Sequence, residues 1–538
     1  MENHPHLRGH LIVDDPDGWA ATYQVAHRKH GTAMASLIVR GGNELADPPL
    51  EQPLYVRPIL QPVQGGFGRV DEASPRGRLW LDVIHQAVRR ILASDVPGGP
   101  VAPSVKIINL SVGDQGRPFL CETSPLARLL DWLSWKHQVL FIVSAGNHGD
   151  DLPRECEDDT RLVQHVFANR RHRRLLSPGE SLNAITVGAV GIDPAPVPPP
   201  PNAKPLPSRP DLPAAYSALG RGHRRSVKPD VLMAGGRQLY RPKLPTADAP
   251  LSTLNPQNVG HLIAVPASVG SRPTARLSGT SNAAALTSRL GGLYAGTVAE
   301  VIARGGHGEW LEGVPIAVVL KVLLVHTAEW RSEAFEFAKR ALADWVDSGR
   351  AKDELSGLLG YGVLRGERGL ACSPDRATAV GGGHISKDMR IRHRVPIPPS
   401  LHLFAGWRRV TITLAWLSPI NSGSRKYRVA RLGLDLPAQK DTPLGVKASQ
   451  VHSDATTRGT VQHFVLERPK GASNTINAGP DDEFEFFVTC AEDGGSLNEP
   501  VPYGIAVSLE VEPGKDIPIY DEVRERLRPR VPVPAAVR

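Results

Sequence analysis

The stretch RLSGTSNAAALTSRLGGLYA (276–295) places Ser281 where a Gly-Thr turn gives way to a helical pattern. Small side chains follow this serine at once, and small residues let a helix pack closely against a sheet. A serine at a helix start also lies beside unpaired N–H groups and the positive end of the helix dipole, which favour an oxyanion. Packing and chemistry both explain the stretch, and the rest of the chain has to distinguish them.

The bulk composition is that of a globular protein. Of the 538 residues, 41% are hydrophobic and 22% charged, and this length allows two or more domains. The first residues (1–10) carry no apolar signal region, and no run approaches the roughly 18 apolar residues of a membrane span. The four cysteines lack metal-type spacing. We therefore expect a cytoplasmic protein with reduced thiols, no cofactor, no bound metal and no membrane contact.

The formal net charge of +8 is modest for this length. The basic clusters NRRHRR (169–174) and RGHRRSVK (221–228) are typical of solvated loops, although such clusters can also contact nucleic acid. The loop interpretation is the simpler one, and we expect no nucleic-acid partner.

The first two-thirds of the chain alternates between short apolar runs and longer amphipathic stretches. The short runs, typical of buried parallel strands, are 105–112, 138–147 and 183–190. The longer stretches, with helical periodicity, are 78–94, 124–137 and 313–330. This order predicts an α/β fold with a doubly wound, mostly parallel sheet, in which active residues gather where strands end and helices begin.

Two later segments differ from this pattern. The proline-rich segment 194–213 predicts an extended surface loop, which is either an inert insertion or a partner-binding element. After about residue 385, β-rich runs separated by turn residues predict an all-β, sandwich-like domain, and 520–530 predicts a short terminal helix. We expect an α/β domain over 1–385 and a C-terminal β-domain over 386–538.

A reactive serine needs a base and a donor for the oxyanion. His30 precedes Gly-Thr at another helix start, in RKHGTAMASLIV (28–39). Asn147 ends the apolar strand FIVSAGN, where its carboxamide can donate to an oxyanion or simply close a turn. INLSVGDQG (108–116) is another strand with a glycine-containing end. Each of these segments is weak evidence alone.

Together and in this order, the segments resemble the subtilisin-like serine proteases, the subtilases. The resemblance rests on HGTAMAS, SAGN and SGTSNAA, with support from INLSVG, AITVGAV, YSALG, KPDV and GYGVL, over about residues 3–385. It implies that Ser281 is the nucleophile, that His30 is its general base, and that Asn147 and the N–H of Ser281 form the oxyanion hole. It also implies a cleft for an extended protein or peptide substrate, lined by Ser111, Val112, Gly113, Ser144, Ala145 and Gly146.

The chain departs from the family pattern at two points. Asn282 stands where the family usually has Met. The family's third triad member, an Asp on a strand before the histidine, has no clear counterpart. Counting back from NHPHL (3–7) places it before Met1, whereas in the alternative Asp14 or Asp15 serves. The short interval from Asp15 to His30 disfavours that alternative.

The resulting hypothesis is a cytoplasmic serine endopeptidase that a regulatory protein partner controls, since an unrestrained protease would damage its own cell. The alternative is a catalytically impaired, peptide-binding protein that keeps the cleft, because the triad Asp is not placed. Other classes fit less well. The chain has no P-loop motif for nucleotides, and it has neither the G-x-S-x-G motif nor the residue order of the α/β-hydrolases.

Overall fold

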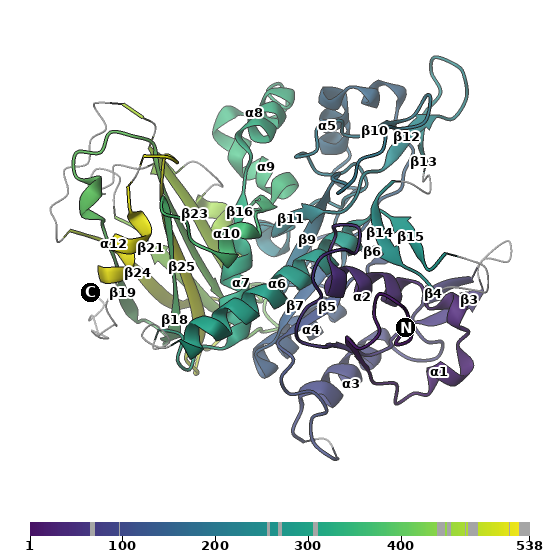
Figure 1. The fold of residues 1–538 in the computed structure, drawn as a ribbon, viewed down its shortest axis with the longest axis horizontal. Helices are drawn as coiled ribbons and strands as arrows, with labels where there is room; N and C mark the ends of the chain where they lie inside the picture. Colours follow the sequence, from purple (N-terminus) through teal and green to yellow (C-terminus); the bar gives the residue numbers. More distant parts are fainter. Residues whose placement is uncertain are drawn as a thin grey trace.

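The structure is a computed structural model that describes residues 1–538 except 65–69, 96, 255–258, 267–271, 305–309, 438–446, 449–452, 469, 472–481, 516 and 527–538. A β-rich part, formed by the C-terminal third of the chain, lies beside an α/β part that contains the N-terminus (Figure 1). Within the described ranges, no helix combines the length and the apolar character that crossing a membrane requires.

A six-stranded sheet with the order β16-β17-β11-β9-β7-β5 forms the centre of the α/β part. Its strands are β5 (Ile107–Leu110), β7 (Leu140–Ser144), β9 (Ile185–Val190), β11 (Val231–Ala234), β16 (Ala328–Glu329) and β17 (Val363–Leu364). Its main helices are α2 (His30–Arg40), α3 (Trp80–Leu92), α4 (Pro125–His137), α6 (Thr280–Ala303) and α7 (Ile316–His326). All neighbouring strands are parallel except β16 and β17, which confirms the predicted sheet.

Helices cover both faces of this sheet, as the side chains of β7 show. Phe141 and Val143 pack in one core with α3 and α4, whereas Leu140 and Ile142 belong to the core beneath α6 and α7. Successive side chains of a strand point to opposite faces. Every residue of β7 is consequently buried, and this explains why its sequence is an uninterrupted apolar run.

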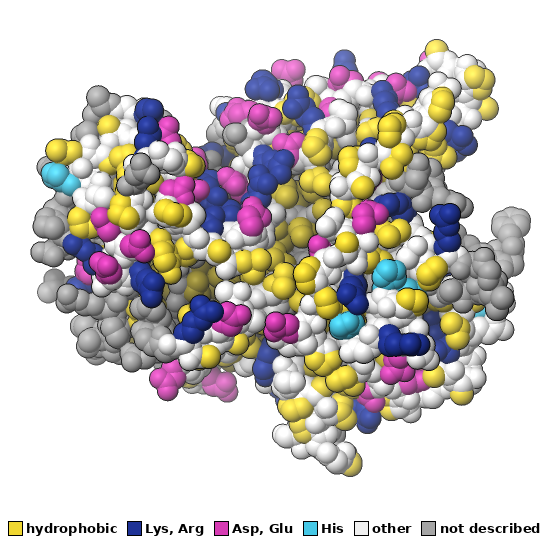
Figure 2. All heavy atoms as spheres, viewed as in Figure 1, with side chains coloured by type: hydrophobic (Ala, Val, Ile, Leu, Met, Phe, Trp, Pro, Cys, Tyr) yellow, Lys and Arg dark blue, Asp and Glu magenta, His cyan; other side chains and the backbone are white. Residues whose placement is uncertain are grey.

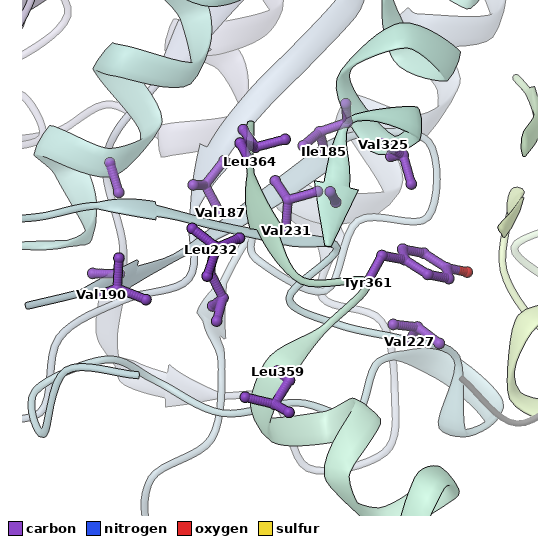
Figure 3. Close-up of a cluster of buried hydrophobic side chains, with 14 of the residues drawn as sticks. Ile185, Val187, Val190, Val227, Val231, Leu232, Val325, Leu359, Tyr361 and Leu364 are labelled. Carbon is purple, nitrogen blue, oxygen red and sulfur yellow. The ribbon is translucent and has the colours of Figure 1, made fainter. Parts of the chain in front are cut away.

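Figure 3 shows part of the core around β9 and β11, the two middle strands of the sheet. The same core also contains Val461 and Ala506 of the β-rich part. Val187 of β9 and Val231 of β11 lie among these side chains, with Val325 of α7 and Tyr361 nearby. The hydroxyl of Tyr361 donates to the carbonyl oxygen of Val461 at 2.8 Å. A residue of the α/β part is thereby hydrogen-bonded to a strand of the β-rich part.

The β-rich part contains two antiparallel sheets that share a core. The five-stranded sheet has the order β18-β25-β20-β23-β22, and the three-stranded sheet β19-β24-β21. Their bounds are β18 (Arg376–Ile385), β19 (Arg390–Pro396), β20 (Arg408–Trp416), β21 (Ala430–Asp435), β22 (Lys447–Ala448), β23 (Val461–Arg468), β24 (Glu483–Glu492) and β25 (Val501–Val511). The terminal helix α12 covers Ile519–Arg526, while 527–530 of its predicted range lie outside the described residues. The domain boundary at 385 stays a prediction, and β18, which ends there, already belongs to the larger sheet.

Helix α7 lies between the two parts and contacts β20, β23 and β25 as well as β7. Every residue of β20 is buried, because one face of this strand meets the second sheet and the other meets α7. The side chain of Lys321 on α7 is 0% exposed and donates to the carbonyl oxygens of Asn183 and Trp416 and to Thr460 Oγ1. Burial lowers the pKa of Lys321 to about 7.

The proline-rich segment is only partly the surface loop that its composition predicts. Its first half, 194–202, is largely exposed. The second half contains a short strand, β10 (Lys204–Pro205), which pairs with β12 (Leu239–Pro242), and it buries Leu206 and Leu212. Apolar anchors therefore fix this half of the segment to the α/β part.

The two basic clusters are not simply solvated loops. Arg173 is 3% exposed and donates to the carbonyl oxygen of Ala215. Lys228 is also buried and binds Asp230 at 2.5 Å. On the face drawn in Figure 2, Lys and Arg side chains alternate with Asp and Glu side chains. The arginine and lysine that the prediction placed in water instead hold loops of the α/β part together.

Candidate active site

Two neighbouring strand ends and the starts of two helices, α2 and α6, form the candidate site. Leu110 of β5 pairs with Val143 of β7 in parallel register, so the segments that follow both strands leave the same edge of the sheet. Helix α6 packs against β5 and β7, and at its start the carbonyl oxygen of Ser281 lies 3.4 Å from Ser111 Oγ. The sheet therefore brings together three segments that the sequence pattern singled out.

Ser281 is the second residue of α6, at the positive end of a 24-residue helix. Its hydroxyl donates to the carbonyl oxygen of Ser111 at 3.3 Å. The alanines that follow the serine, Ala283–Ala285, are fully buried. Ala285 packs against Ala33 and Leu37 of α2. Packing thus explains the small residues, and it does so without using the serine side chain.

His30 is the first residue of α2, and its Nε2 atom lies 2.9 Å from the same Ser111 carbonyl oxygen. A carbonyl oxygen can only accept, so Nε2 carries the proton in this arrangement. The side chains of His30 and Ser281 thus meet at one acceptor atom. A base would need the other tautomer, with Nε2 unprotonated and facing the serine hydroxyl.

Asn147 is attached to the same helix start. Its Oδ1 accepts from the N–H of Thr280 at 2.9 Å and from Thr280 Oγ1 at 3.0 Å. Nδ2 lies on the Gly279 side, where a Cβ built on Gly279 would be 3.4 Å away from it. The carboxamide oxygen is thus hydrogen-bonded to the start of α6. Asn147 is exposed, so its N–H₂ group is available as a donor.

The acidic residues that the sequence offered as triad members are bound elsewhere. Asp14 accepts from Arg90 at 2.7 and 2.8 Å and from Tyr55 at 2.5 Å, and these partners, Arg90 first, lower its pKa. Asp15 accepts from the N–H groups of Trp19 and Ala20. Strand β1 (Leu11–Val13) pairs with β2 (Leu54–Val56) outside the six-stranded sheet. Among the described residues, no carboxylate is hydrogen-bonded to a ring nitrogen of His30.

One carboxylate that the sequence pattern did not point to accepts a hydrogen bond from the main-chain N–H of His30. Glu72 on β4 (Val70–Ala73) accepts from the N–H of His30 at 2.7 Å with one oxygen. Its other oxygen accepts from the Tyr23 hydroxyl at 2.9 Å. Burial, together with Glu72, raises the pKa of Tyr23. No motif marks Glu72, because a hairpin distant in sequence brings it to the start of α2.

The expected cleft residues lie at the end of β7 and directly after β5 and β7, and a leucine lies against them. Ser111, Ser144, Ala145 and Gly146 are buried, Val112 is half-buried and Gly113 is exposed. Leu176 of β8 (Leu176–Ser177) contacts both glycines, because a Cβ on Gly146 would lie 2.5 Å from its Cγ and a Cβ on Gly113 3.2 Å from its Cβ. The roles of these residues toward a substrate stay a prediction.

A family profile and one relative match this chain in sequence. The profile of the Subtilase family, Peptidase_S8, matches residues 1–362. The uncharacterized protein y4bN of Sinorhizobium fredii is 26% identical over 454 residues, covering 79% of this chain and 96% of that protein.

Two solved structures are also similar. The patellamide maturation protease PatA is 19% identical to this chain, with a TM-score of 0.37. The match covers 69% of this chain and 91% of that chain. The self-cleaved protease domain of PatA is 18% identical, with a TM-score of 0.34 and coverage of 67% and 87%. The family match spans most of the α/β part, including His30, Asn147 and Ser281, and this chain therefore belongs to the subtilase family of serine proteases.

Proposed function

We propose that this chain is a serine endopeptidase that cleaves peptide bonds through an acyl-enzyme on Ser281. One observation carries the proposal: Ser281 Oγ and His30 Nε2 both lie within hydrogen-bond distance of the Ser111 carbonyl oxygen, at 3.3 and 2.9 Å. The mechanism requires the serine hydroxyl to turn from that carbonyl to the imidazole, with Nε2 unprotonated. Catalytic hydrogen bonds often form only once substrate is bound.

In this mechanism, each group has a defined task. His30, with Nε2 unprotonated, takes the hydroxyl proton as Ser281 attacks the substrate carbonyl carbon. The developing oxyanion accepts from Asn147 Nδ2 and from the N–H of Ser281, at the positive end of α6. The imidazolium then protonates the leaving amine. In the second half of the reaction, water gives a proton to His30 and attacks the acyl carbon, and the Ser281 oxygen leaves and takes that proton back. The segments after β5 and β7 hold the substrate as an extended strand.

A matched pair of variants tests the proposal. Hydrolysis of an unfolded protein substrate is measured for the chain, for Ser281→Ala and for Ser278→Ala. Ser278 lies in the same turn, but its hydroxyl donates to the carbonyl oxygen of Arg237. We expect activity in the chain and in Ser278→Ala, and none above background in Ser281→Ala. Equal activity of the chain and Ser281→Ala would contradict the proposal.

A second function, peptide binding without hydrolysis, is favoured by a specific observation. In the part of the chain that the structure describes, the His30 ring has no carboxylate partner to fix the tautomer that catalysis needs. In subtilisin, loss of the triad Asp lowers the rate by about 3 × 10⁴. Saturable binding of an unfolded protein substrate by a folded chain that does not cleave it would support this second function.

A further inference from the structure

We propose that Leu176 closes the pocket next to the reacting carbonyl, so that the residue contributing this carbonyl is glycine, alanine or serine. The inference rests on the proposed function for its reaction, but the pocket itself is defined by packing. The attacked carbonyl has to lie between Ser281 Oγ and Asn147 Nδ2. In the proposed mechanism the segments 111–113 and 144–146 hold the substrate strand, so the side chain on that residue projects between them.

Gly113 and Gly146 face each other across this space. A Cβ built on Gly113 would lie 3.9 Å from the Cα of Gly146. Gly146 has φ +108°, a left-handed conformation that L side chains rarely adopt, so this position requires glycine. Two glycines at the walls of a pocket ordinarily make room for a ligand side chain.

Here the room is filled by the chain itself. A Cβ on Gly146 would approach Leu176 Cγ at 2.5 Å and Leu176 Cβ and Cδ1 at 2.8 Å. The same leucine is 3.2 Å from a Cβ on Gly113. Leu176 is only 4% exposed, so its side chain is in contact with protein on almost every side. A large substrate side chain would occupy the volume that this leucine already holds.

The backbone of Leu176 is fixed at this place. Its N–H donates to the carbonyl oxygen of Ala145 at 2.9 Å, and its carbonyl accepts from the N–H of Gly179 at 2.8 Å. Strand β8 pairs with β6 (Asp114–Pro118), which continues directly from Gly113. The two walls and the leucine are therefore hydrogen-bonded into one unit, and widening the pocket would break main-chain hydrogen bonds.

The test measures peptide binding in a variant without the Ser281 hydroxyl, so that the result does not depend on catalysis. Peptides that end in Ala or in Phe, as products of cleavage would, are titrated against the full chain carrying Ser281→Ala. The same titration is made with Leu176→Ala and with Leu175→Ala added to that background. Leu175 is the matched control: it is the neighbouring leucine, directly before β8, and it packs with Phe119, Ala145 and Ala218, whereas the side chain nearest to a Cβ on Gly113 or Gly146 is that of Leu176. Thermal unfolding checks that each variant is folded.

We expect the Ala-ending peptide to bind at least about tenfold more tightly than the Phe-ending peptide. Leu176→Ala should reduce or reverse this ratio by a similar factor, and Leu175→Ala should preserve it. Equal binding of both peptides, no saturable binding of either, or a ratio unchanged by Leu176→Ala would overturn the inference. Hydrolysis by the chain with Ser281 intact tests the proposed function alone. If the chain binds Ala-ending peptides preferentially but does not hydrolyse a substrate, the proposed function is wrong and the inference about the pocket stands.

Discussion

The Nε2 atom of His30 lies 2.9 Å from the carbonyl oxygen of Ser111. This hydrogen bond joins the start of α2 to the end of β5, and it places the imidazole at the atom to which the Ser281 hydroxyl also donates. The two groups that a serine protease needs next to each other are thus brought together by a third residue.

Asn147→Ala should lower kcat by about 10²–10³ with a much smaller change in KM, because only the oxyanion loses a donor. Asn147→Asp is the companion variant, since it keeps an oxygen for the N–H of Thr280 but removes the N–H₂ group. Steady-state kinetics on a fluorogenic peptide ending in Ala before the reporter group measures both. A kcat within twofold of the unmodified chain in both variants would exclude Asn147 from the oxyanion hole.

Glu72→Ala should lower the free energy of unfolding by about 1–2 kcal/mol, the usual cost of removing an acceptor at a helix start. It removes the acceptor of the His30 N–H and one of the two acceptors of the Tyr23 hydroxyl, which also lies 3.0 Å from the carbonyl oxygen of His27. Glu72→Gln retains an acceptor oxygen and should be intermediate. Urea denaturation measures these differences. The contribution of Glu72 would be refuted by an alanine variant as stable as the parent chain.

Lys321 should make stability rise with pH above neutrality. Burial lowers its pKa from 10.5 to about 7, so between these pH values the unfolded chain binds a proton that the folded chain does not. The free energy of unfolding then gains up to about 1.4 kcal/mol per pH unit from this group. Lys321→Met should flatten the rise between pH 7.5 and 9.5 in urea denaturation, and Lys243→Met, at an exposed lysine, should not. If stability rises equally with pH in Lys321→Met and in the parent chain, Lys321 is not the group responsible for the rise.

His463 should also make stability rise with pH, but on the acid side of neutrality. Burial lowers its pKa from 6.5 to about 3, so the unfolded chain binds the additional proton when the pH falls below 6.5. Stability contributed by the neutral histidine is present above pH 6.5 and is lost as the pH falls toward 3. We expect the loss of stability between pH 7 and 5 to be about 2 kcal/mol smaller in His463→Gln than in the parent chain. His172→Gln, at an exposed histidine, should show the parent's loss.

The sequence allowed prediction of those features that depend on local pattern. Strands such as β7 were recognisable because both faces are covered, which makes the whole run apolar. Ser281 and Asn147 were recognisable because each follows a strand or turn in a characteristic motif. Lys321 carried an available signal, a lone lysine within the apolar run IAVVLKVLLVH (316–326), which marks a helix with a buried polar contact.

The remaining features depend on contacts between distant segments. Glu72 reaches His30 through the hairpin of β3 (Gln61–Gln64) and β4. Leu176 reaches Gly146 through its main-chain hydrogen bond to Ala145 and the pairing of β6 with β8. The packing of the second half of the proline-rich segment against the α/β part was not predicted. Its many prolines indicate a loop, and this hides the two leucines that are buried there, Leu206 and Leu212. The position of α7 between two sheets could not be inferred either, because a uniformly apolar helix does not show which elements cover it.

The central claim is that Ser281 is an activated nucleophile. The direct measurement is reaction of the full chain with a small alkyl fluorophosphonate, followed by peptide mass spectrometry to locate the adduct. We expect stoichiometric modification of Ser281 in the native chain and none after denaturation, since activation requires His30 and the start of α6 in place. A folded chain that remains unmodified, or an adduct on another serine, would contradict the account.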